Sequence, residues 1–208
     1  MSEPSLVLRR PADPLTDGVV TLDRFTRDDV VDIVRAIDDE ILRWLPLPDP
    51  YGETEARGFV AAPPNTASEG AALNFAIRCE ARLAGSVGVS ISRPRTGEVE
   101  VGYWVAPHAR HQGVALRAVL LVAGHALAAE GVERLEILCH PDNRASRHVA
   151  ERAGAQFEGI RRHGLPPPPR QGSTDAAVYA LLPEDVAAVH GDPRSGATPR
   201  RRSAPGSR

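Results

Sequence analysis

The sequence predicts an α/β fold of the α+β type, in which helices flank a mixed but mostly antiparallel sheet. Three strand-like runs, 73–78, 83–91 and 98–105, follow one another with only short turns between them, which is typical of an antiparallel meander. An Ala- and Leu-rich helical stretch at 114–130 then leads into another strand at 134–139. A strand, a helix and a second strand in that order indicate one parallel crossover within the sheet.

The elements before the meander are expected to be short. The β-rich run 19–22 is the first structured element that the sequence predicts. A helix should come next, because 26–29 supply an N-cap signal with acids in the first turn and apolar residues recur at helical spacing over 30–42. Three prolines within 46–50 end that helix, and a short helix restarts over about 54–62.

The elements after the crossover continue the alternation of helices and strands. Gly131 is a stop signal for the Ala- and Leu-rich helix. A further helix is predicted over 143–152 and is closed by Gly154. Two more strands are predicted over 157–162 and 176–182. The predicted order is therefore β, α, α, β, β, β, α, β, α, β, β.

One domain of ordinary size accounts for most of the 208 residues. We expect an N-terminal segment at 1–16, the folded domain at 17–186 and a disordered basic tail at 187–208. The residues after His190 are rich in Gly, Pro, Ser and Arg and offer almost nothing apolar to bury. The three arginines at 200–202 are either a contact for nucleic acid or an anionic surface, or simply part of a solvated tail.

The charge is unevenly distributed along the chain. All 25 basic residues are arginines, and the formal net charge is −2. The tail 191–208 holds five Arg and one Asp, so removing its +4 from the total of −2 leaves −6 for the rest of the chain. An acidic body argues against a nucleic-acid-binding domain, which usually has a basic face, and it suits a cationic substrate such as an amine.

The sequence predicts neither a membrane span nor an export signal. Its uncharged apolar runs fall short of the ~20 residues that a transmembrane helix needs. The N-terminus lacks the basic, apolar and small-residue order of a secretion signal. We therefore expect a soluble, cytoplasmic protein.

Neither a metal site nor a disulfide is expected. Cys79 and Cys139 lie 60 positions apart without ligand-type neighbours. The seven histidines follow no metal-binding pattern; His108 and His111 are three apart, but in a Pro-containing loop. Cys139, at a strand end, is interpreted as a buried structural thiol, with an acyl-carrying nucleophile as the alternative.

The loop 107–115 carries the first chemical signal. It runs from a strand directly into a helix, whose first-turn N–H groups have no internal acceptor and lie at the positive end of the helix dipole. Gly113 lets the backbone approach a ligand closely, and the small Ala115 leaves the ligand's path open. This arrangement suits a phosphate or pyrophosphate. The alternative is an ordinary helix entry with a Gly near its start.

Four segments in order give the sequence a resemblance to a known family. They are Glu100–Val105, Arg110–Ala115, Pro141–Ser146 and Glu151–Ala155. The second resembles the R/Q-x-x-G-x-G/A motif of the GNAT superfamily of N-acetyltransferases. The set is similar to the RimJ/RimL-like branch, which includes the ribosomal-protein N-terminal acetyltransferases. Further features of that branch are Trp44 to Pro46 and Asp175 with Tyr179, so the resemblance covers about 17–186.

The resemblance implies a GNAT fold, in which two central strands splay into a V that holds the pantetheine arm of the cosubstrate acetyl-CoA. Its pyrophosphate would rest on backbone N–H groups of the motif loop. The residues that the resemblance places against acetyl-CoA are Val105, Arg110, His111, Gln112, Gly113, Val114, Ala115, Asn143 and Ser146. The amine would attack the thioester directly in a ternary complex, without a covalent intermediate or a metal.

The same resemblance suggests the acid-base groups and the substrate side of the cleft. Glu100 stands where many relatives place a carboxylate base, which requires burial or a water relay; the alternative is a solvent-facing strand residue. Ser146 stands where relatives contact the cofactor or protonate the leaving thiolate, and is otherwise a helix-surface serine. Asn143 fits an N-cap and a pantetheine contact together. Trp44 and Tyr179 are assigned to the substrate side, although a strand tyrosine is commonly part of the core.

The acceptor does not follow from the resemblance, because the chain departs from the branch in two places. Ala155 stands where relatives usually carry an aromatic residue. The prolines at 166–169 stiffen the segment 165–172, which replaces a loop that overlies the acceptor site in relatives. A protein N-terminus, an aminoglycoside-like compound and a small metabolic amine are all candidate acceptors. The expected partners are acetyl-CoA and this amine, with neither membrane nor nucleic acid; homodimerisation is left open.

Two functions of other classes also stay open. A non-catalytic CoA-binding module for regulation or interaction predicts cofactor binding without turnover, and no effect of Glu100→Gln. A ribosome- or nucleic-acid-associated protein predicts salt-dependent RNA binding through 191–208, without acetyl-CoA. The acidic body weighs against the second of these.

Overall fold

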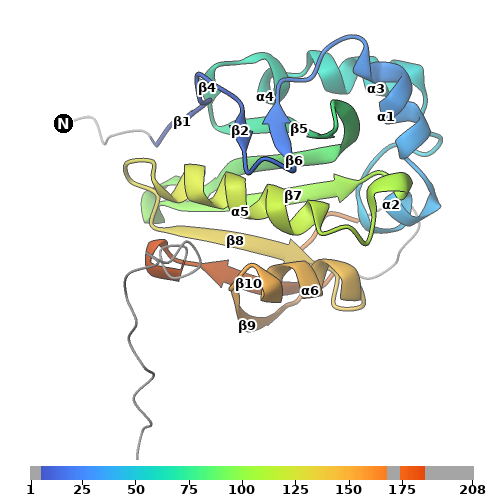
Figure 1. The fold of residues 1–208 in the computed structure, drawn as a ribbon. Helices are drawn as coiled ribbons and strands as arrows, with labels where there is room; N and C mark the ends of the chain where they lie inside the picture. Colours follow the sequence, from blue (N-terminus) through green and yellow to red (C-terminus); the bar gives the residue numbers. More distant parts are fainter. Residues whose placement is uncertain (1–5, 168–173, 186–208) are drawn as a thin grey trace, which may run out of the picture.

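The computed structural model describes residues 6–167 and 174–185, which form a mixed sheet with helices on both faces (Figure 1). The strands are β1 (Leu8–Arg9), β2 (Leu15–Thr16), β3 (Thr21–Asp23), β4 (Glu69–Gly70), β5 (Ala72–Cys79), β6 (Arg82–Arg93), β7 (Glu98–Val105), β8 (Arg134–Cys139), β9 (Gln156–Arg161) and β10 (Ala176–Leu181). The helices are α1 (Asp29–Ala36), α2 (Asp39–Trp44), α3 (Glu53–Ala61), α4 (Pro63–Thr66), α5 (Val114–Leu127) and α6 (Arg144–Arg152), with 3₁₀ turns at Pro94–Thr96 and Pro107–Ala109. Eight strands lie in the order β2-β3-β5-β6-β7-β8-β10-β9, and β1 pairs separately with β4.

The predicted fold class is confirmed. The strands β5, β6 and β7 form the antiparallel meander. Among the described strands, β7 and β8 are the one parallel pair, and α5 makes the crossover between them. These two strands have the bounds that the sequence predicts, 98–105 and 134–139.

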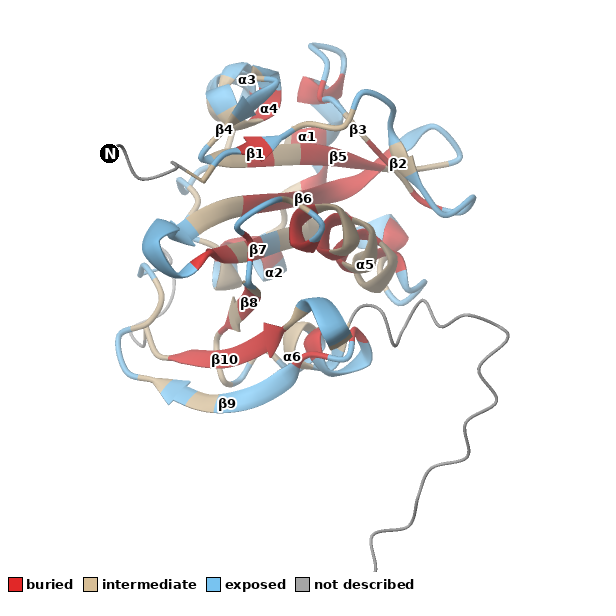
Figure 2. Ribbon diagram, turned by 90° about the vertical axis from the view of Figure 1, so that its left-hand side faces the viewer, coloured by how far each residue is buried: buried red, intermediate tan, exposed pale blue. Residues whose placement is uncertain are grey.

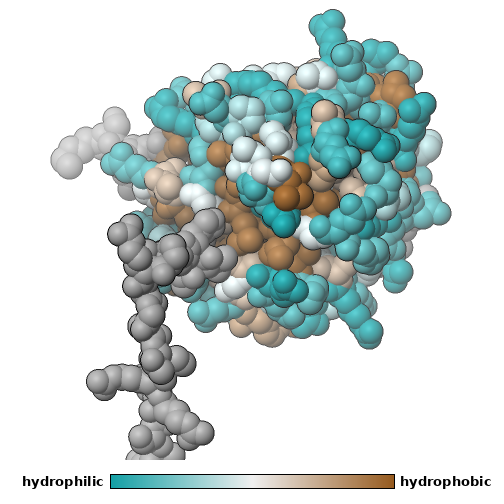
Figure 3. Space-filling model, in the orientation of Figure 1, coloured by the Kyte–Doolittle hydropathy of each residue, from teal (hydrophilic) through white to brown (hydrophobic). Residues whose placement is uncertain are grey.

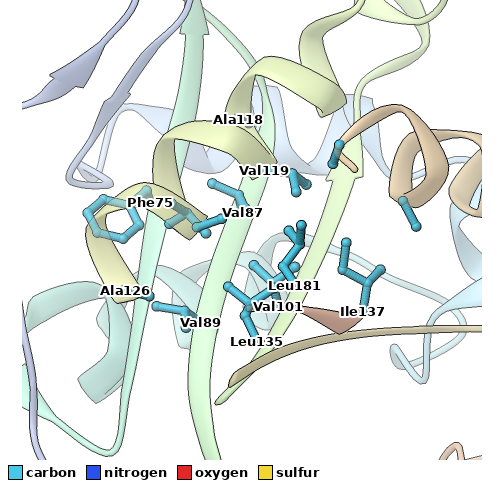
Figure 4. Close-up of a cluster of buried hydrophobic side chains, with 14 of the residues drawn as sticks. Phe75, Val87, Val89, Val101, Ala118, Val119, Ala126, Leu135, Ile137 and Leu181 are labelled. Carbon is cyan, nitrogen blue, oxygen red and sulfur yellow. The ribbon is translucent and has the colours of Figure 1, made fainter. Parts of the chain in front are cut away.

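The two faces of the sheet are covered by different helices. α5 and α6 lie on one side (Figure 2), where α5 buries Ala118 and Val119 against the sheet. Odd-numbered strand residues such as Val101 and Ile137 face them (Figure 4). A second apolar cluster comes from α1, α3, the sheet and the segment before α1, and comprises Phe25, Val30, Ile33, Ala56, Val60, Ala76 and Leu83. Because side chains alternate along a strand, the even-numbered residues of β7 point to this second side.

The single helix predicted over 30–42 is wrong, because two helices occupy this stretch. α1 ends at Ala36, and Asp38 has extended backbone with φ −109° and ψ 178°. The Asp38 carboxylate accepts a hydrogen bond of 3.0 Å from the N–H of Ile41 and so caps α2. The same carboxylate binds Arg110, 72 positions along the chain, and helical periodicity contains no sign of that contact.

The expectation that the first element begins at residue 19 is also wrong. β1 pairs with β4, and β2 pairs with β3 at the edge of the main sheet. Two-residue strands are too short to show an alternating pattern, so the sequence does not reveal them.

The tail 187–208 and most of the segment 165–172 lie outside the described residues. Within residues 6–167 and 174–185, no helix is long and apolar enough to cross a membrane.

A buried ion pair fastens α1 to the sheet. Both terminal nitrogens of Arg78 donate to the Asp29 carboxylate at 2.9 Å, and the two side chains are only 17% and 7% exposed. Burial by itself raises the pKa of Asp29, but hydrogen bonds from Arg78 and from the Thr26 N–H outweigh it and hold the pKa below its ordinary value. The carboxylate therefore stabilises the fold at neutral pH, and this contribution is lost as the pH falls through the lowered pKa.

Replacing Arg78 with Met should lower the free energy of unfolding by about 3 kcal/mol at pH 7, because Asp29 is left buried without its cation. Denaturant unfolding followed by circular dichroism measures the loss. Arg57→Met is the matched control: Arg57 pairs with Glu53 at the surface, with both side chains more than half exposed, and its loss should stay below about 0.5 kcal/mol. Equal losses in the two variants would contradict the role of the buried pair.

Candidate active site

The two parallel strands separate at one end and form a V. β7 and β8 pair only from Glu98 with Arg134 to Val101 with Ile137. Beyond that point, 102–105 of β7 have no partner on β8. Both strands run toward this open end, so the loops that follow them bring the N-termini of α5 and α6 there (Figure 1). Two helix N-termini at the carboxyl ends of parallel strands give this edge a positive potential that suits an anionic ligand.

The loop before α5 has the backbone shape of an anion site. His111 and Gly113 both have left-handed backbone, with φ +61° and +75°. Residues 110–113 form a turn, and successive N–H groups in such a turn conformation form a nest, a concavity that suits an anion. The first helical bond of α5 is donated by the Arg117 N–H to the Gly113 carbonyl at 3.1 Å, so the N–H groups before it have no acceptor within the helix. A Cβ built on Gly113 meets nothing within 4 Å, so the space beside it is open.

The side chains of this loop mostly bind the protein itself. The Gln112 amide donates to the His108 carbonyl at 2.9 Å. The Arg110 guanidinium makes two bonds of 2.8 Å to Asp38 and a third of 3.2 Å to the Val105 carbonyl. Arg110 thus joins the end of β7 to the start of α2. The Arg110 and Gln112 side chains are therefore engaged within the protein, which leaves the backbone of these residues for a ligand.

At the N-terminus of α6, Asn143 and Ser146 lie as the sequence predicts for a helix start. The Asn143 side chain accepts a hydrogen bond of 3.0 Å from the Ser146 N–H and caps the helix. The Ser146 hydroxyl lies 2.8 Å from the hydroxyl of Tyr103 on β7. This pair links β7 to α6, the helix that follows β8. Burial raises the pKa of Tyr103, an effect that the Ser146 hydrogen bond opposes only in part, so the phenol keeps its proton.

Tyr103 was missed as a candidate, although a signal existed. It lies two positions after Val101 and so shares the face on which α5 packs. Cys139, at the end of β8, is on this face too and is buried. Burial raises the pKa of the Cys139 thiol, which keeps it in the unreactive thiol form.

Glu100 lies on the other face of the sheet, immediately before the strands part. It is half-buried, opposite Ser90 of β6 and Glu136 of β8. Burial, followed by the negative charge of Glu136, raises the pKa of Glu100, and the cation of Arg161 offsets this only partly. No arginine within ion-pair distance of Glu100 occurs in the part of the chain that the structure describes.

The carboxylates around Glu100 are, in contrast, neutralised by arginines. Glu136 is almost fully buried and accepts hydrogen bonds from Arg134 and Arg161. Arg134 also binds Glu158 of β9. The sequence shows these charges at alternate strand positions, but their pairing depends on strand register. Glu100 is therefore set apart from these neighbours, because no ion pair or hydrogen bond from an arginine neutralises it in the described part of the chain.

The two residues assigned to the substrate side lie in different places. Trp44 ends α2, and its ring centroid lies 5.5 Å from that of His140, the residue after β8. Tyr179 is fully buried on β10, where its hydroxyl binds Arg147 and Glu151 of α6. The structure thus brings Trp44 to the open end of the V but does not bring Tyr179 to Glu100.

An apolar surface lies between α5 and α6 (Figure 3). The two helices carry partly buried apolar side chains that pack against the core, among them Leu116 and Leu120 of α5 and Val149 of α6. A surface of this kind suits the uncharged part of a long ligand whose anionic end rests on the helix N-termini. Among the described residues, no group of three His, Cys, Asp or Glu is arranged to hold a metal ion.

Comparisons with known proteins agree with this arrangement. A family model described as acetyltransferase (GNAT) domain matches residues 20–156. RimL, a ribosomal L7/L12 α-N-protein acetyltransferase solved with coenzyme A in a disulfide with a cysteine, is 20% identical with a TM-score of 0.71, over 82% of this chain and 98% of that one. RimJ of Mycobacterium smegmatis, solved with a CoA disulfide, is 21% identical with a TM-score of 0.69, over 89% and 94%. The microcin C7 self-immunity acetyltransferase MccE, solved with acetyl-CoA and AMP, is 19% identical with a TM-score of 0.69, over 81% and 98%. At these identities the structures establish a shared fold.

Proposed function

Because the chain belongs to the GNAT acetyltransferase family, we propose that it transfers the acetyl group of acetyl-CoA to a primary amine by direct attack within a ternary complex. The observation that carries this proposal is the V between β7 and β8, with the nest at His111–Gly113 on one of its edges and Glu100 on the opposite face. A CoA ligand on one side and an amine on the other would meet only through this opening.

The residues present fit acetyl-CoA. The N–H groups of Gln112 to Ala115 would hold the pyrophosphate, and the apolar surface between α5 and α6 would cover the pantetheine arm. Bound in this way, acetyl-CoA supplies an activated thioester. Asn143 and Ser146 lie at the second helix N-terminus, where the arm would pass.

The reaction needs one group to take a proton from the amine and another to return a proton to the thiolate, and groups suited to these roles lie on opposite faces of the sheet. The C–N bond forms as the C–S bond breaks, and the amine loses one proton. Glu100, with its raised pKa and no paired cation, is suited to take that proton directly or through water. The hydroxyl pair of Ser146 and Tyr103 is suited to return a proton to the leaving thiolate. Catalysis otherwise depends on holding the two substrates together.

A peptide N-terminus is the first acceptor class to test. The motifs resemble the RimJ/RimL-like branch, and RimL and RimJ are among the similar structures, which supports this choice. The acidic body of the chain also favours a cationic acceptor over an anionic one.

Calorimetric titration with acetyl-CoA tests the proposal, and we expect a Kd in roughly the micromolar range. Release of free thiol from acetyl-CoA is then followed with peptides that have a free N-terminus and with small amines. The chain has no lysine, so acetyl transfer to its own lysine side chains cannot contribute to the signal. Binding without thiol release for any amine would favour the non-catalytic CoA-binding module, and absence of binding would refute the proposal.

A further inference from the structure

His140 has an unsatisfied hydrogen-bonding atom at the open end of the V. It directly follows β8, and its side chain is only 10% exposed. Its Nε2 is buried and has no hydrogen-bond partner among the residues that the structure describes. Buried polar atoms normally have a partner, so an orphaned one marks a position where a water, an ion or a ligand atom would complete the hydrogen bond.

The hydrogen bond at Nδ1 determines whether Nε2 is a donor or an acceptor. The backbone N–H of Asp142 donates to His140 Nδ1 at 3.1 Å. A neutral imidazole has one N–H, and since Nδ1 accepts, the proton is on Nε2. Nε2 is therefore a donor and does not act as a proton acceptor in this tautomer. It also points away from the turn that holds Nδ1.

The neighbours of His140 place this donor on the side of the V where Glu100 lies. The Cys139 side chain belongs to the core beneath α5 and α6, so the next residue along the chain points to the opposite face. There the His140 ring meets Trp44. Trp44 is held in turn by a hydrogen bond of 2.7 Å to Glu40 and by the Arg43 guanidinium 4.7 Å from its ring. α2, which carries Trp44, is itself attached to the motif loop through Asp38 and Arg110.

We propose that His140 and Trp44 form a subsite for the acceptor, in which Nε2–H donates to an oxygen next to the reacting amine. This inference rests on the proposed acetyl transfer. In an α-aminoacyl group, such as a peptide N-terminus, a carbonyl oxygen lies one carbon from the amine-bearing carbon. That oxygen satisfies the buried donor, whereas an alkyl amine leaves it unpaired. A site of this kind selects α-amino carbonyl compounds over simple alkyl amines.

An experiment can distinguish this proposal from an alternative ligand for the same N–H group. If Nε2–H instead binds the acetyl carbonyl of acetyl-CoA, its loss affects every acceptor equally. The test compares alaninamide with isopropylamine, which has a methyl group in place of the carboxamide. The protein variants are the wild type, His140→Phe, which keeps a ring against Trp44, and His148→Phe, the same change at an exposed position of α6.

Two readouts are needed, so that a failure of this inference differs from a failure of acetyl transfer. Calorimetry with CoA present measures amine binding without turnover, and thiol release measures kcat/KM. For His140→Phe we expect about a tenfold or greater loss with alaninamide in both readouts, and less than about twofold with isopropylamine. Acetyl-CoA affinity should be unchanged, and His148→Phe should behave as the wild type.

Three outcomes would overturn the subsite. They are equal losses for the two amines, no loss for either, and a wild type that binds alaninamide no more tightly than isopropylamine. A wild type that binds alaninamide selectively but releases no thiol would contradict the acetyl transfer and leave the subsite supported. A wild type that fails to bind acetyl-CoA likewise counts against the transfer alone, because amine binding is then measured by itself.

Discussion

Replacing Glu100 with Gln is expected to lower kcat/KM for acetylation by about 100-fold or more, because the amine loses the group suited to take its proton. Acetyl-CoA affinity should be unchanged, since Glu100 lies on the face opposite to α5 and α6. The amide has nearly the shape of the carboxylate, so the change tests charge rather than packing. Initial rates of thiol release at saturating acetyl-CoA measure the effect.

The same substitution should stabilise the folded protein at pH 7. The pKa of Glu100 is raised above its ordinary value of 4.5, first by burial and then by the charge of Glu136. The folded state therefore binds the proton more tightly than the unfolded state, and stability falls as the pH rises from the ordinary pKa through the raised one. Gln is uncharged, so the variant avoids the cost of burying a negative charge beside Glu136. Thermal unfolding of both proteins between pH 4 and 8 should show the wild type losing stability relative to the variant.

Glu158→Gln provides the matched control for this prediction. Glu158 lies in the same group of charges, but it binds Arg134 and its pKa is lowered by that hydrogen bond. Its loss should reduce stability slightly and change kcat/KM by less than about threefold. If Glu100→Gln keeps activity within threefold of the wild type, Glu100 is a structural strand residue and the base must be sought elsewhere.

The sequence predicts the centre of this fold better than its periphery, for physical reasons. β7, β8 and α6 have strong local signals: alternation over 98–105, an apolar-rich strand at 134–139, and Asn143 as a side-chain cap. Local signals fail at Asp38, because the periodicity of the helix continues through it while its carboxylate caps a second helix. The same carboxylate also binds Arg110, a partner that only the folded chain brings near.

The candidate site likewise has one part that the sequence predicts and another that only the folded structure shows. The motif loop 110–115 is contiguous, so the sequence shows it as a candidate anion site, with an ordinary helix entry as the alternative, and the family resemblance favours the anion site. The pair Tyr103–Ser146, the neutralised Glu136 and the orphaned His140 donor each join segments more than 30 positions apart or depend on register. No single-sequence pattern encodes such a pairing. The charge environment of Glu100 therefore becomes visible only when β7, β8 and β9 are aligned.

Gly113→Glu should abolish acetyl-CoA binding, raising the Kd by about 100-fold or more in calorimetric titration. A side chain at this position starts in the open space next to the nest, where the pyrophosphate is proposed to lie. A carboxylate there both fills the space and repels the phosphates. The left-handed φ of +75° adds backbone strain, which by itself is no reason for a specific loss of ligand.

Gly18→Glu separates these effects. Gly18 is likewise exposed, has φ +86° and would place a Cβ with nothing within 4 Å, but it lies in the turn between β2 and β3. The two variants therefore share the strain, the added charge and the exposure. They differ in that Gly113 belongs to the motif loop, whereas Gly18 follows Asp17, whose carboxylate pairs with Arg117 of α5. Loss of binding in Gly113→Glu with wild-type binding in Gly18→Glu would assign the pyrophosphate to the loop before α5. Wild-type affinity in both would mean that CoA is held elsewhere, and equal loss in both would mean that the strain, and not the site, accounts for the effect.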